Sequence, residues 1–139
     1  MISKKAMAGF LALALIIPVA LPIPAFARPA TAEGALRKEL LDTLRKDVVK
    51  ELGAPIVFVV EKAVVEGDWA FVLATPWRTP EVPVDWEKTI CSGDVSHLVG
   101  ALLKRENGIW TVKSTALCPT DVAWETWPQD YGAPAAIFN

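Results

Sequence analysis

The chain has 139 residues, of which 53% are hydrophobic, and this length suits one domain with a single modest core. Its 14 Lys and Arg residues are outnumbered by 16 Asp and Glu, giving a formal net charge of −2, and they form no basic cluster. Because phosphate groups and anionic lipids are bound through Lys and Arg, this composition excludes nucleic acid and an anionic membrane surface as expected partners.

Residues 1–27 predict a signal peptide. Lys4 and Lys5 give a positively charged start, an uncharged apolar run follows, and Ala25-Phe26-Ala27 supplies the small-x-small pattern of a cleavage site. Cleavage there leaves residues 28–139 as the mature domain and lowers the formal charge from −2 to −4, because both lysines are lost. We therefore expect a periplasmic or secreted protein.

An uncleaved membrane anchor is the alternative for this segment. Residues 6–27 carry no charge, and about 20 apolar residues are enough to span a bilayer. Three prolines at the far end favour cleavage, because they would break a spanning helix: Pro18, Pro22 and Pro24. Membrane contact is expected only if the signal stays uncleaved.

Both cysteines, Cys91 and Cys118, lie in the mature region. In an exported chain an even cysteine count favours a disulfide, and two cysteines allow a single pairing. The bridge would close a loop of about 28 residues and contribute about 3.5 kcal/mol in the chain-entropy description.

The first structural element after the short leader 28–32 is an amphipathic helix. Apolar residues recur at helical spacing, and Gly53 followed by Pro55 is a stop signal. The helix of about five turns carries one apolar stripe, made of Leu36, Leu40, Leu41, Leu44, Val48, Val49 and Leu52.

Four strands in two hairpins follow the helix. Residues 56–65 are rich in β-branched side chains, and residues 69–76 follow a tight turn. Residues 96–106 and 109–118 flank Asn107-Gly108, a strong hairpin signal. The pattern predicts an α+β fold in which the N-terminal amphipathic helix packs on a curved antiparallel sheet.

The second strand has one face of large and one face of small side chains. Trp69, Phe71 and Leu73 alternate with small residues, so we expect the large face to meet the helix. Between the hairpins, residues 75–94 form a long connection without clean periodicity, of a kind that is usually functional or partly disordered. Within it, Val84–Ile90 is a candidate fifth strand at an edge.

The order helix, VVEGDWAFVLATP, VGALLKRENGIWTVKS resembles small exported bacterial domains of cystatin-like or nuclear-transport-factor-2-like fold. The resemblance covers roughly residues 34–118 and rests on Lys104, Gly108, Trp110 and Val112 in the last hairpin. It implies a helix lying across a curved sheet. Proteins of the nuclear-transport-factor-2-like group usually have extra helices that enclose a deep pocket. Because this chain shows one helix, the cystatin-like arrangement without such a pocket is favoured.

No residue set points firmly to catalysis or to a metal. His97 is the single histidine, and a Ser96–His97 neighbour pair on a strand would point to opposite faces. The three Cys and His residues of the mature region are too few for a structural zinc site, and no cofactor is expected. A small hydrolase or isomerase remains an alternative, with acids from Asp94, Asp121 or Glu125 and a contribution from His97.

Aromatic residues are the strongest candidate functional feature. Trp69 and Trp110 lie in predicted strands and are expected in the core, whereas the other four tryptophans lie in irregular segments. Thr120 or Asp121 could cap a short helix through Trp124. The candidate binding residues are Trp77, Trp86, Trp124, Trp127 and Tyr131.

The stretch WETWPQDYGAP, residues 124–134, has two interpretations that are compatible with each other. It is a clasp that covers an otherwise open sheet face, or a surface that binds a ligand. The functional hypothesis is a non-catalytic binding or accessory module that holds a small ligand, a peptide, a glycan or an exported partner protein. Inhibition of an exported hydrolase and a purely structural role in the envelope are further alternatives.

Overall fold

The computed structural model describes Gly9 and residues 28–139, so the predicted signal peptide, apart from Gly9, lies outside the described residues. The domain is α+β, with one main helix and a five-stranded antiparallel sheet in the order β1-β2-β3-β4-β5. The elements are β1 (Ala30–Thr31), α1 (Gly34–Leu52), β2 (Ile56–Glu66), β3 (Trp69–Arg78), η1 (Trp86–Lys88), β4 (Val99–Glu106), β5 (Ile109–Leu117), α2 (Trp127–Tyr131) and η2 (Ala135–Phe138).

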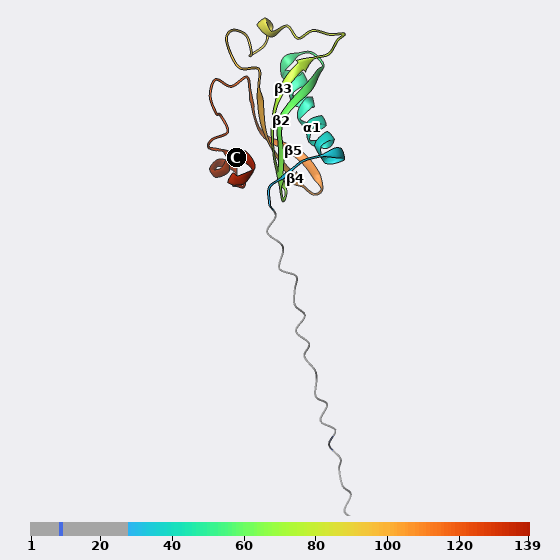
Figure 1. The fold of residues 1–139 in the computed structure, drawn as a ribbon, viewed down its shortest axis with the longest axis vertical. Coiled ribbons are helices and arrows are strands. Elements are labelled where there is room, and N and C mark those ends of the chain that lie inside the picture. The colour runs from blue at the N-terminus through green and yellow to red at the C-terminus, as the bar shows by residue number, and fades with distance from the viewer. Residues whose placement is uncertain (1–8, 10–27) are drawn as a thin grey trace, which may run out of the picture.

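Three layers make up the domain (Figure 1). Helix α1 covers one face of the sheet, and the C-terminal tail, residues 119–139, covers part of the other. Strand β4, which lies between β3 and β5, is buried on both faces over Val99–Leu103, because each face has a cover. This arrangement separates a helix-side core from a tail-side core.

Helix α1 follows its apolar pattern. Leu40, Leu44, Val48 and Leu52, each four residues apart, are its buried residues. The helix ends at Gly53, whose left-handed backbone (φ 68°) lets its N–H bond to the carbonyl oxygen of Val49.

The small face of β3 meets the helix, so the expectation that the large face would do so was wrong. Ala70, Val72 and Ala74 lie in the helix-side core. Phe71 lies in the tail-side core, with Trp69 and Leu73 packed against it. Small side chains on the sheet leave room for the leucines of α1, and the large rings need the second cover that the tail supplies.

The fifth strand is not where the sequence placed it. Residues 84–90 hold the short 3-10 helix η1, whereas β1 lies in the leader and pairs with Val64 and Val65 of β2. Three smaller expectations were also wrong. Trp77 was expected in an irregular segment but belongs to β3, and His97 was expected in a strand but precedes β4. The short helix of the tail was expected to pass through Trp124, but it begins at Trp127 after turns that include Trp124.

The disulfide joins Cys91 to Cys118, with Cα atoms 5.4 Å apart. Cys91 lies in the long connection 79–98 and Cys118 begins the tail, so the bridge fixes both segments at the same end of the sheet (Figure 1).

Candidate binding surface

The tryptophans of the tail form a clasp. Trp127 is 6% exposed, and Ile137 is fully buried beside Phe71 and Leu102. The ring centroid of Phe71 lies 5.6 Å from that of Trp124 and 4.8 Å from that of Phe138. These contacts place the tail in a second hydrophobic core, where aromatic rings add to stability through tilted packing.

Lys62 fixes the end of the tail to the sheet. Its Nζ donates to the oxygens of Phe138 (3.5 Å) and Asn139 (2.6 Å). Lys62 lies on β2, next to a bulge between Val60 and Lys62, where the strand changes register against β3. The tail is therefore held at its start by the disulfide and at its end by Lys62.

Trp86 lies on the opposite side of the domain from the tail tryptophans. It packs against the helix-side core and stacks on His97, with ring centroids 4.0 Å apart and planes 12° from parallel. The Ser96 hydroxyl accepts a hydrogen bond from the Leu98 N–H, 3.2 Å away. Stacking gives His97 a packing role, and Ser96 is engaged with its own loop.

Trp77 is the most exposed of the five candidate residues. Its exposed fraction is 56%, and it pairs in register with Val57 on β2. Val57 and Val59 are themselves 47% and 57% exposed. Side chains at every second position of β3 share a face, so Trp77 lies on the same face as Phe71.

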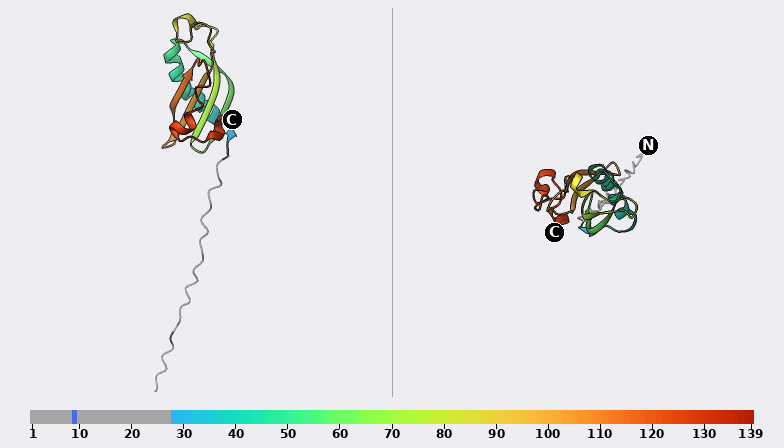
Figure 2. Two further views of the ribbon diagram at one scale, coloured as in Figure 1. Left: turned by 90° about the vertical axis from the view of Figure 1, so that its left-hand side faces the viewer. Right: turned by 90° about the horizontal axis from the view of Figure 1, so that it is seen from above.

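Val57, Val59 and Trp77 form what we call the open half-face. The C-terminal helices cover the part of the sheet beside Phe71, and β2 and β3 continue beyond them toward the long connection (Figure 2). At the end of β3 the surface is hollowed by about 510 Å³, lined by Val57, Trp77, Arg78, Thr79 and Pro80. Exposed apolar side chains next to a hollow are typical of a binding site.

The five candidate residues are thus divided among three places. Trp124 and Trp127 lie in the tail-side core, Trp86 packs on the helix side, and Trp77 lies on the open half-face. Tyr131, 40% exposed, ends α2 in the tail. The structure does not bring them together as one aromatic surface.

The exposed valines of the open half-face, Val57 and Val59, were not among the residues predicted from the sequence. An unbroken apolar run such as IVFVV is typical of a strand buried on both faces, and so it conceals an exposed face. The usable signal was that the tail is too short to cover a whole sheet.

The candidate acids of the enzymatic alternative are on the surface. Asp94, Asp121 and Glu125 are all exposed. The carboxyl groups with lowered pKa lie elsewhere. The pKa of Asp42 is lowered by hydrogen bonds from Lys38 and Arg45, and that of Glu106 by a hydrogen bond from Lys113.

Two further observations concern the part of the chain that the structure describes. Within it, no group of three or more His, Cys, Asp or Glu side chains is placed to hold a metal ion. None of its helices is long and apolar enough to cross a membrane. Comparison of the whole chain with protein-family models, with curated proteins and with solved structures finds no match in any of the three.

Proposed function

We propose that the chain is an exported, non-catalytic binding module that holds an extended segment of a partner protein on the open half-face. The observation that carries the proposal is the 56% exposure of Trp77 beside two exposed valines, on a sheet face that the tail covers only beside Phe71 and Leu102. Exposed rings and β-branched side chains lose solvent when a partner docks, and this loss favours binding.

Export is part of the proposal. The disulfide between Cys91 and Cys118 supports an oxidising compartment, because such bridges persist in secreted and periplasmic proteins. The pattern of residues 1–27 supports delivery there through a cleaved signal peptide.

A cystatin-like relationship is also a proposal. It is supported by one helix across an antiparallel sheet whose strands follow in chain order. Such a fold assigns no function by itself, because one fold hosts many activities.

Photo-crosslinking in cells that naturally produce the chain tests the binding function. Val59 is replaced by p-benzoylphenylalanine, and exposed Lys46 on α1 is replaced in the same way as the matched control. We expect a polypeptide adduct at position 59 that is lost when Trp77→Ala is added, and none at position 46. Equal adducts at both positions, a glycan adduct, or no adduct at position 59 would overturn the proposal.

A further inference from the structure

Within the part of the chain that the structure describes, no strand lies next to the edge of β2 beside the open half-face. Strand β1 pairs only with Val64 and Val65, and the Ala32 N–H adds one bond to the Ala63 carbonyl oxygen at 2.8 Å. Upstream, residues 56–60 pair with β3 on one side. On their other side no strand of the described residues 28–139 pairs with them.

The register shows which backbone groups point outward from this edge. The backbone N–H and C=O of Ala63 point away from β3, because this carbonyl oxygen accepts a hydrogen bond from the Ala32 N–H. Its partner on β3 is Val72, and Ala74, two residues on, has the same orientation and pairs with Val60. The backbone N–H and C=O groups of Val60 therefore also point outward from the edge, as do those of residues 58 and 56. Three outward N–H and C=O pairs can receive an added strand.

Cations lie along the helix side of the same edge. The guanidinium of Arg45 lies 5.5 Å from the ring centroid of Phe58. Arg78 pairs in register with Ile56 and alternates with Trp77 on β3, so its side chain leaves the backbone on the helix side, at the strand end where it also lines the hollow. Within residues 28–139 Arg78 makes no salt bridge, as the pairs formed there involve other residues.

A hollow of about 240 Å³ on α1 extends this positive region. Three of its lining residues are cations and one is a carboxylate. The lining residues are Gly34, Arg37, Lys38, Leu41, Asp42 and Arg45. The carboxylate of Asp42 is already bonded to Lys38 and Arg45. The local charge is therefore positive, although the chain as a whole is negative.

We infer that the partner segment joins the free edge of β2 as a sixth strand, with acidic side chains on its helix side and apolar side chains on its other side. Successive side chains of an added strand point to opposite faces. One set lies beside Arg45 and Arg78, and the other set lies beside the open half-face. The inference rests on the proposed function and adds to it the backbone pairing and an alternating acidic–apolar sequence.

Charge disfavours a second copy of the chain as the occupant. Antiparallel pairing of two β2 edges about a twofold axis near Phe58 would bring Arg45 close to Arg45 of the other copy. Like charges brought together in a partly dry interface cost free energy, whereas carboxylates there gain it.

The inference is tested by measuring how synthetic peptides bind to the protein purified from cells that express the full chain. The probe is a capped ten-residue peptide of alternating Glu and Val. Its matched controls replace Glu by Lys, group the same residues into two blocks, or N-methylate every second amide. Binding is measured by chemical-shift changes of the ¹⁵N-labelled protein.

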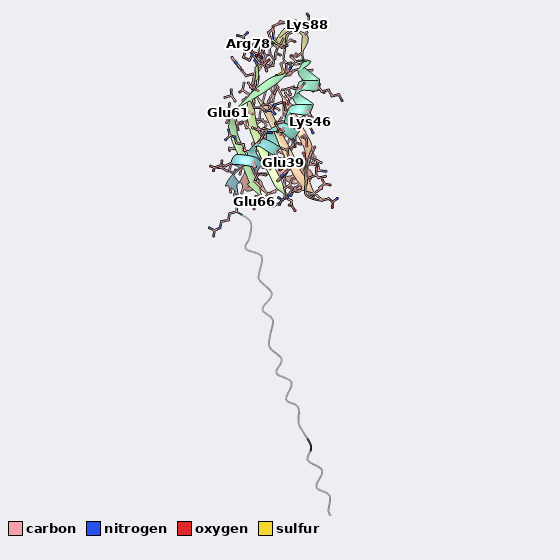
Figure 3. The ribbon with its side chains drawn as sticks, turned by 90° about the vertical axis from the view of Figure 1, so that its right-hand side faces the viewer. Glu39, Lys46, Glu61, Glu66, Arg78 and Lys88 are labelled. Atoms are coloured by element: carbon pink, nitrogen blue, oxygen red, sulfur yellow. A yellow bond between two sulfur atoms is a disulfide. The ribbon has the colours of Figure 1, made fainter. Side chains whose placement is uncertain are left out.

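We expect the Glu–Val peptide to bind about tenfold more tightly than the Lys–Val peptide, and N-methylation to abolish binding. Arg78→Gln should weaken binding about fivefold, and Lys46→Gln, an exposed site on the far side of α1, should leave it unchanged (Figure 3). Val60→Pro should abolish binding by removing one outward N–H. If that variant fails to fold, the N-methylated peptide decides the same question.

Equal binding of the Lys–Val or N-methylated peptide would overturn the inference. So would the absence of peptide binding in a protein that still gives the Trp77-dependent adduct at position 59, and the proposed function would then stand. Absence of both peptide binding and the adduct would overturn the proposed function together with the inference.

Discussion

Gly100 of β4 lies directly under the indole ring of Trp124. A Cβ built at Gly100 would come within 2.6 Å of Cε3 of that ring, closer than real Cβ atoms approach other side chains. The tail therefore docks on a position where only glycine fits. Gly100→Ala should lower the free energy of unfolding by about 1–3 kcal/mol, as overpacking does in other cores.

A double-mutant cycle checks this relationship by urea unfolding. When Trp124→Ala has removed the ring, Gly100→Ala should cost much less, because nothing remains for the methyl group to displace. Additive losses in the two single variants and the double variant would contradict the contact.

Tryptophans of the tail and of the open half-face should differ in their effect on stability. Trp127→Ala removes a side chain that is 6% exposed, and we expect a loss of about 3–5 kcal/mol. Trp77→Ala removes a ring that is 56% exposed, and we expect a loss within about 1 kcal/mol. Chemical unfolding of the two variants makes the comparison, and equal losses would mean that Trp77 has a packing role.

The disulfide should contribute about 3.5 kcal/mol to stability. Replacing both Cys91 and Cys118 by Ser should lower the free energy of unfolding by about this amount, because the unfolded chain regains the freedom that the bridge removes. Urea unfolding with and without a reductant measures the effect. The double-serine protein is the control, since a reductant should not change it.

The network around Asp42 should make stability depend on acid pH. Hydrogen bonds from Lys38 and then Arg45 lower the pKa of Asp42 below its ordinary value of 3.8. Because the folded-state pKa is the lower one, the stabilisation is present above the ordinary value and is lost as pH falls through the folded-state pKa. Asp42→Asn should therefore be less stable than the wild type near neutral pH and equally stable in strong acid.

Unfolding at about pH 7 and about pH 2 measures this difference. Asp47→Asn on the same helix is the matched control, as Asp47 makes no ion pair among residues 28–139. High salt should reduce the Asp42 effect, because the network lies at the surface. A deficit that persists in strong acid would show that the asparagine acts through something other than charge.

Local signals in the sequence predicted the main helix and the long strands, because each leaves a pattern within its own segment, whereas the disulfide was predicted from the even cysteine count of a chain expected to be exported. The apolar stripe from Leu40 to Leu52 and the Asn107-Gly108 turn are of this kind. The two residues of β1 are too short to show any alternation. The assignment of the Ala70 face to the helix depends on how closely two layers approach, and this is a property of the assembled core.

The candidate binding residues were only partly separable from the sequence. The sequence does not distinguish the buried Trp124 and Trp127 from the exposed Trp77, because all three lie near prolines and turns. Their difference depends on where the tail stops. The tail covers Phe71 and Leu102 and leaves Val57 and Val59 exposed, and no local pattern records that limit.

The bridge between Cys91 and Cys118 also determines how the protein would respond to a protease. A single cut anywhere in residues 92–117 leaves two fragments that remain covalently tied, because each keeps one of the cysteines. A cut in residues 79–90 puts both cysteines on the same fragment and leaves the two pieces held together by packing alone. Resistance to nicking is therefore unequal along the long connection, because one cleavage before Cys91 can divide the domain and one cleavage after Cys91 cannot.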